Sequence, residues 1–118
     1  MIGIFHKKDL DGWCSGAIMM RKYPGIELIG WDYGQPIPDV PKGSEVIMSD
    51  ISFPPEVMDE IGKRCKSMVW IDHHHSAIMD HMKFYAGKIA PYTTVLPPLK
   101  DGEIIRKLGA CELTWSYL

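Results

Sequence analysis

Four short apolar segments, each followed at once by an acidic or imidazole side chain, constrain the fold of this 118-residue chain more than any other feature. The segments cover residues 2–5, 26–31, 45–49 and 68–71, and they are followed by His6, Asp32, Asp50 and Asp72. Near-continuous apolar runs of this length are typical of strands that are buried on both faces of a parallel sheet. The chain therefore predicts strands with ionisable groups at their carboxyl ends.

Helices are expected between these strands. Residues 13–23 are rich in helix-forming side chains and stop at Pro24-Gly25. Pro54 and Pro55 stand where a second helix would begin, because the first helical turn does not need a proline N–H. The alternation predicts one α/β domain over residues 1–118, a three-layer α/β/α arrangement with a mainly parallel sheet.

The carboxyl ends of parallel strands meet at one edge of the sheet, where α/β proteins bind their ligands. Three predicted strands bring acids or histidines to this edge: His6, Asp9 and Asp11 after the first, Asp50 after the third, and Asp72, His73 and His74 after the fourth. Carboxylates and imidazoles together suit Mn²⁺, Mg²⁺ or Zn²⁺. We therefore expect a metal site here, with Asp50 able to bridge two ions about 3.5–4 Å apart.

Each of these groups also has a simpler interpretation. Asp9 and Asp11 precede a predicted helix, and acids are common near a helix N-terminus. Asp50 taken alone is an ordinary acid at the end of a strand, and the run 72–74 can be a helix cap followed by exposed histidines. We expect the two remaining histidines to be peripheral or packing residues, His75 and His81.

Composition excludes several classes of protein. With 13 basic and 15 acidic residues the net charge is −2, which argues against a general nucleic-acid coat protein, since such proteins depend on excess Lys and Arg. The chain has no Gly-rich phosphate loop, no nucleophilic-serine elbow, and no apolar run near the roughly 18 residues that cross a membrane. Its three cysteines have no close pair, which favours a reducing cytoplasm, and we expect Cys14 and Cys111 to be buried.

The rest of the chain gives weaker signals. We expect a helix over residues 77–82 capped by Ser76, a strand within residues 92–96, a turn at Asp101-Gly102, and a helix over residues 103–118 interrupted at Gly109. The chain ends on an apolar stretch that, together with Trp13, could present a surface to a second copy: Leu113, Trp115, Tyr117 and Leu118.

Four motifs resemble those of the DHH phosphoesterase superfamily, and most closely its oligoribonuclease or nano-RNase-like branch. The motifs are His6-Lys7-Lys8-Asp9-Leu10-Asp11-Gly12, Ser49-Asp50, Asp72-His73-His74 and Gly109-Ala110-Cys111-Glu112-Leu113-Thr114-Trp115. The resemblance spans nearly the whole chain. It implies a hydrolase with two metal ions, usually manganese, that cleaves phosphodiesters.

The resemblance also implies a role for each residue of the predicted site. His6, Asp9 and Asp50 would hold the first ion. Asp11, Asp50 and His73 would hold the second. His74 would contact the scissile phosphate, and Asp72 would orient a histidine, as metal-bound imidazoles usually require.

Two parts of the family pattern are not found in these 118 residues. The family has a further aspartate ligand after the helix that contains Trp115, and a smaller C-terminal domain that binds the far end of the substrate. We therefore expect the catalytic domain alone.

The expected function is the hydrolysis of short oligonucleotides or dinucleotides to mononucleotides. The alternatives are a truncated or degenerate domain that binds metal or a partner without catalysis, and a manganese-dependent pyrophosphatase.

Overall fold

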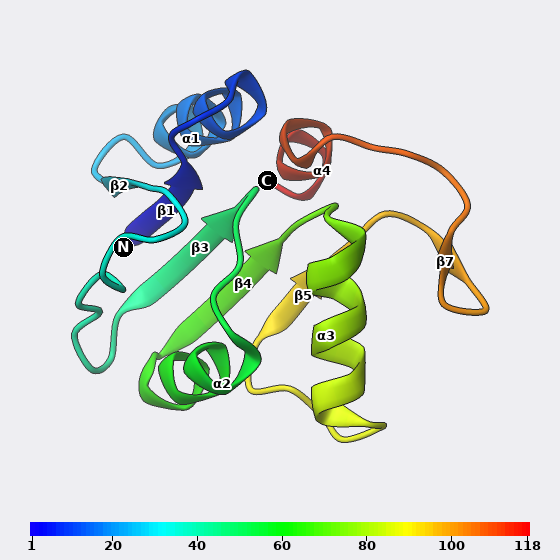
Figure 1. Cartoon of the computed structure of the whole chain (residues 1–118). Coiled ribbons are helices and arrows are strands. Elements are labelled where there is room, and N and C mark those ends of the chain that lie inside the picture. The colour runs from blue at the N-terminus through cyan, green and yellow to red at the C-terminus, as the bar shows by residue number, and fades with distance from the viewer.

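Five parallel strands form the centre of the computed structural model, which describes residues 1–118 (Figure 1). The strands are β1 (Ile2–His6), β2 (Glu27–Trp31), β3 (Glu45–Ser49), β4 (Ser67–Ile71) and β5 (Thr93–Val95). They lie in the order β2-β1-β3-β4-β5, and every neighbouring pair is parallel. The carboxyl ends of β1, β3 and β4 therefore lie side by side, as the sequence predicts.

Two helices cover each face of the sheet (Figure 1). Helices α1 (Leu10–Lys22) and α4 (Ala110–Tyr117) lie on one face, and α2 (Pro55–Arg64) and α3 (His75–Tyr85) lie on the other. This arrangement confirms the predicted three-layer α/β/α fold. None of the four helices combines the length and the apolar character that a membrane span requires.

Alternate side chains of the central strands pack into two separate cores. On β3, Val46 and Met48 belong to the core beneath α2 and α3, whereas Ile47 belongs to the core beneath α1 and α4. Trp70 and Ile71 of β4 divide in the same way, and both are fully buried. Burial on both faces explains why these strands are apolar throughout instead of alternating with polar residues.

The predicted helix over residues 103–118 is wrong in its first half. Residues Glu103–Ile104 form strand β7, which pairs antiparallel with β6 (Leu99–Lys100). Asp101 and Gly102 form the turn between them, with φ angles of 52° and 78° that a helix cannot contain. The turn signal therefore outweighs the helical composition, and α4 begins only at Ala110.

Two smaller expectations are also corrected. Helix α3 begins at His75 with His74 as its N-cap residue, so Ser76 is not the cap. Cys14 is exposed and Cys111 is half-buried. The face of α1 that meets the sheet is formed by its small residues and Met19, and Cys14 lies on another side of the helix. The short strand expected within residues 92–96 is confirmed as β5.

A buried hydrogen bond fixes α4 to the sheet. The hydroxyls of Ser49 and Thr114 lie 2.8 Å apart, and Thr114 donates to the carbonyl of Ala110 at 2.7 Å. Both side chains are fully buried. We expect Thr114→Val to lower the free energy of unfolding by about 1–3 kcal/mol, because the Ser49 hydroxyl then stays buried without a partner.

Denaturant unfolding of Thr114→Val, Ser49→Ala and the double variant measures this coupling. The double variant should lose less than the sum of the two single variants. Strict additivity would contradict a direct hydroxyl pair.

Candidate metal centre

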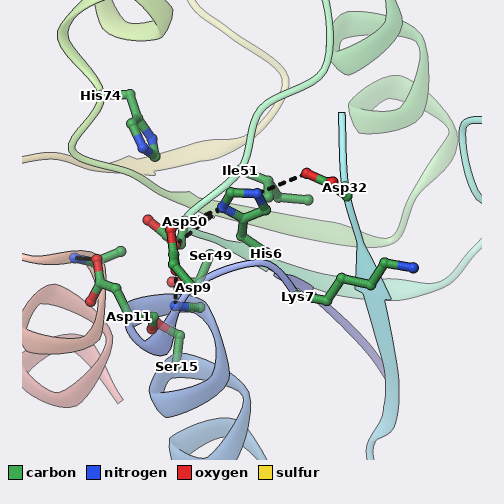
Figure 2. Close-up of polar contacts among 12 residues, drawn as sticks. His6, Lys7, Asp9, Asp11, Ser15, Asp32, Ser49, Asp50, Ile51 and His74 are labelled. Atoms are coloured by element: carbon green, nitrogen blue, oxygen red, sulfur yellow. Dashed lines mark hydrogen bonds and ion pairs between the residues drawn. The ribbon is translucent and has the colours of Figure 1, made fainter. Parts of the chain in front are cut away.

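All seven residues of the predicted site lie at the carboxyl edge of the sheet, and Figure 2 labels five of them, His6, Asp9, Asp11, Asp50 and His74. They come from the end of β1, the N-cap and first turn of α1, the residue after β3, and the segment that joins β4 to α3: His6, Asp9, Asp11, Asp50, Asp72, His73 and His74. The strands set the spacing of these groups, because adjacent parallel strands end at the same level.

Asp50 lies at the centre of the cluster. Its side chain is fully buried, and its backbone has a φ of 65°, a left-handed conformation that Asp tolerates better than most residues. Its Oδ1 lies 2.9 Å from Nε2 of His73, and its Oδ2 lies 3.6 Å from Nδ1 of His6. The two carboxylate oxygens therefore face two different imidazoles, one from each side of the site.

His6 lies between three carboxylates. Its Nδ1 is 3.1 Å from Oδ2 of Asp9 and faces Asp50, while its Nε2 is 3.0 Å from Oδ1 of Asp32 (Figure 2). Asp32 was not among the predicted site residues. A signal for it existed, because Asp32 directly follows β2 at the same edge of the sheet. By binding Nε2, Asp32 fixes the orientation of the His6 ring, so that Nδ1 faces Asp9 and Asp50.

Asp9 combines both roles that the sequence allowed. One oxygen accepts a hydrogen bond from the amide of Gly12 at 2.8 Å, which makes Asp9 the N-cap of α1. The other oxygen faces His6. Capping and a place in the cluster are therefore compatible, since a carboxylate has two oxygens to offer.

Asp11 contacts a part of the chain that lies almost a hundred residues away. Its Oδ2 accepts from the amide of Ala110 at 2.9 Å, and its Oδ1 accepts from the amide of Cys111 at 2.8 Å. Asp11 thus binds the N-terminus of α4, where free amides and the helix dipole favour a negative charge. Its Oδ2 also lies 3.2 Å from Nε2 of His73, which places Asp11 at the border of the cluster.

Asp72 organises the two histidines that follow it. Its buried Oδ1 lies 2.6 Å from Nδ1 of His74 and accepts from the amides of His73 and His74 at 2.8 and 3.3 Å. This contact engages one ring nitrogen of His74 and leaves Nε2 available. His75 and His81 lie apart from the cluster. His75 is exposed, and its Nε2 lies 3.8 Å from Oε2 of Glu103. The ring of His81 packs against the ring of Trp70.

The electrostatics of the cluster follow from its burial. Burial raises the pKa of Asp50 to about 6, and the neighbouring carboxylates of Asp9 and Asp11 add to this rise. The contact with Asp50 raises the pKa of His73, and the contact with Asp72 raises the pKa of His74. Without a cation, Asp50, His73 and His74 therefore retain protons that isolated side chains would release at the same pH. The pKa values of Asp9 and Asp11 are instead lowered, in both cases by hydrogen bonds that their carboxylates accept.

Two buried carboxylate oxygens of the site have no hydrogen-bond partner, and this bears on whether a metal ion fits there. Oδ2 of Asp50 and Oδ2 of Asp72 are buried and make no hydrogen bond. Leaving a buried acceptor unsatisfied costs about 1–3 kcal/mol, and more for a charged group. A cation placed among these oxygens would satisfy them, so the donor set fits a metal.

Two overlapping groups of side chains could hold an ion. Potential ligand atoms lie within 4.8 Å of one another in each group. The first group is His6, Asp9 and Asp50, and the second is Asp50, Asp72, His73 and His74. Asp50 belongs to both.

No protein-family model, curated protein or solved structure matches the chain. The DHH resemblance therefore depends on the motif residues at the edge of the sheet. It enters the functional assignment below as a proposal.

Proposed function

We propose that this chain is the catalytic domain of a DHH-type phosphodiesterase that hydrolyses short oligonucleotides or dinucleotides to mononucleotides. The observation that supports it best is the position of Asp50, fully buried between two groups of imidazoles and carboxylates. Since Asp50 belongs to both groups, its carboxylate would be available to both ions of a two-metal site. We propose Mn²⁺ as the ion, with Mg²⁺ as the alternative.

Each side chain has a part in the proposed reaction. His6, Asp9 and Asp50 would hold one ion, and Asp11, Asp50 and His73 would hold the other. Divalent ions held by these residues would supply an activated water molecule and neutralise charge on the phosphoryl oxygens.

The chain's own groups orient the substrate. Asp72 holds Nδ1 of His74 and so turns its Nε2 outward. Because this contact raises the pKa of His74, the ring keeps its proton to a higher pH than a free histidine would. A protonated His74 donates a hydrogen bond to a phosphate oxygen. Asp32 and Asp72 act by positioning histidines.

We expect His73→Ala to lower Mn²⁺-dependent cleavage of a dinucleotide by at least about 100-fold, since even partners of metal ligands cost 10–100-fold when they are removed. The fold should persist, because His73 is partly exposed and packs in neither core. The matched control is His75→Ala, an exposed histidine two positions along the chain. Initial rates with Mn²⁺ measure the cleavage activity of both variants, and circular dichroism measures whether they keep the fold. Equal rates in the two variants would contradict the assignment.

A function without catalysis is the second candidate, and two observations favour it. Asp9 and Asp11 both accept hydrogen bonds from helix amides, so they stabilise the fold without a metal. Trp13 and Trp115 expose 56% and 62% of their surfaces, which suits contact with a second copy. Assays of a dinucleotide and of inorganic pyrophosphate, side by side with Mn²⁺, separate phosphodiesterase, pyrophosphatase and binding protein. Sedimentation measures whether two copies of the chain associate.

We also propose that the protein is cytoplasmic, because its number of cysteines is odd.

A further inference from the structure

A cavity of about 400 Å³ opens on the α2–α3 side of the sheet, beside the metal centre. Its volume lies within the range of about 300–1,000 Å³ that is usual for ligand sites. Six of its 15 lining residues have aromatic rings: Trp31, Tyr33, Phe53, Trp70, His81 and Tyr92.

The floor of the cavity is buried and apolar. Trp31, Phe53 and Trp70 are at most 5% exposed. The indole N–H of Trp31 donates to the carbonyl of Pro36 at 3.0 Å, and that of Trp70 donates to the carbonyl of Ile51 at 2.8 Å. Because both N–H groups are already bonded within the chain, neither can bond to a ligand, and the floor is apolar. Such a surface favours a flat, apolar ring.

The rim of the cavity is polar. His81 uses Nδ1 in a contact of 2.9 Å with the hydroxyl of Tyr92, and its Nε2 makes no hydrogen bond. Burial lowers the pKa of His81 and so favours the neutral ring. Nε2 can bond to a heteroatom of a ligand. Asp80 and Gln35 are exposed on the same rim. Polar groups around an aromatic floor suit a heteroaromatic ring better than a purely hydrocarbon one.

Tyr33 connects the cavity to the metal centre. Its ring lines the cavity, packs against Trp31 with ring centres 5.3 Å apart, and packs against His6 at 5.6 Å. Its hydroxyl accepts from the amide of Ser52, two residues after Asp50. One side chain therefore separates a ligand in the cavity from the proposed ligands of the metal.

We propose that this cavity binds one nucleobase of the substrate, so that the adjoining phosphodiester lies at the metal centre. The inference rests on the proposed function, because it assigns to that site a substrate that carries a base. The ring of Tyr33 would contact the base in the cavity, and it also packs against His6. Aromatic walls bind bases of any sequence, since every base has a flat π-face.

Binding to the metal-free chain tests the inference without hydrolysis. Adenosine 5′-monophosphate and ribose 5-phosphate are titrated while the indole N–H resonances of Trp31 and Trp70 are followed by NMR. We expect adenosine 5′-monophosphate to shift both resonances and ribose 5-phosphate to shift neither. Tyr33→Ala should weaken the binding of adenosine 5′-monophosphate about tenfold, in keeping with the loss of one base–aromatic contact. Tyr33→Phe, which keeps the ring, should bind as the wild type does.

Tyr117→Ala is the control, because Tyr117 is an exposed tyrosine of α4 outside the cavity and the metal centre. The inference is overturned if ribose 5-phosphate binds as well as adenosine 5′-monophosphate, or if Tyr33→Ala binds adenosine 5′-monophosphate as the wild type does. Nucleotide binding as expected, in a chain that hydrolyses no phosphodiester with Mn²⁺, would support the cavity assignment and contradict the proposed catalysis.

Discussion

Asp50→Asn is expected to abolish metal binding while leaving the metal-free chain at least as stable as the wild type. Asn has the same shape as Asp and tolerates the left-handed backbone at this position, where φ is 65°. It lacks the charge that a cation requires and that burial disfavours. A residue present only for the fold would show the opposite result, with lower stability after the substitution.

The raised pKa of Asp50 predicts how the stability of the metal-free wild type changes with pH. The pKa of Asp50 rises from its ordinary value of 3.8 to about 6 in the folded chain. Between these values the unfolded chain has released the proton and the folded chain retains it, so stability falls as the pH rises. The loss is complete above pH 6 and has an upper limit of about 3 kcal/mol. Asp50→Asn has no such proton, so its advantage over the wild type should appear between pH 4 and pH 6.

Thermal unfolding across this pH range, with and without Mn²⁺, measures both effects. Mn²⁺ should raise the melting temperature of the wild type and not that of Asp50→Asn, because only a species that binds the ion is stabilised by it. Asp101→Asn is the matched control, since Asp101 also has a positive φ and is exposed in the β6–β7 turn. A wild-type response to Mn²⁺ in Asp50→Asn would exclude Asp50 as a ligand.

The sheet and its edge could be predicted because their signals are local in the sequence. Residues 45–49 are apolar and are followed by Asp50, and this pattern alone indicates a buried strand that delivers an acid to the edge. The contact between Asp11 and the amides of Ala110 and Cys111 has no such signal. It joins residues about a hundred positions apart, and it depends on where α4 begins.

The two errors have different physical causes, one local and one that depends on a contact between elements. Residues 103–109 contain helix formers, but the turn at Asp101-Gly102 pairs β6 with β7 and so removes the start of that helix. Asp32 was overlooked because one acid after a strand is common, and only the position of His6 gives it a role. Local patterns therefore predict the elements, whereas contacts between elements decide which side chains complete the site.

Gly12→Ala is expected to cause the largest loss of stability among the single substitutions proposed for this chain. A Cβ at this position would lie 1.8 Å from the carbonyl oxygen of His6 and 2.7 Å from its carbonyl carbon. Both are backbone atoms, so no rotation of a side chain can relieve the overlap. The first turn of α1 would have to move away from the end of β1, and Asp9 and Asp11 would move with it.

We expect Gly12→Ala to lower the free energy of unfolding by about 3 kcal/mol or more, at or above the usual range for overpacking. For a chain of this size the melting temperature should fall by roughly 10 °C or more. Gly25→Ala is the matched control, because a Cβ there has no atom within 4 Å and its φ is not positive. Thermal unfolding and Mn²⁺ titration of both variants make the measurement. If Gly12→Ala melted like Gly25→Ala, α1 could not lie as close to β1 as the metal centre requires, because the same approach that excludes a Cβ brings Asp9 to His6.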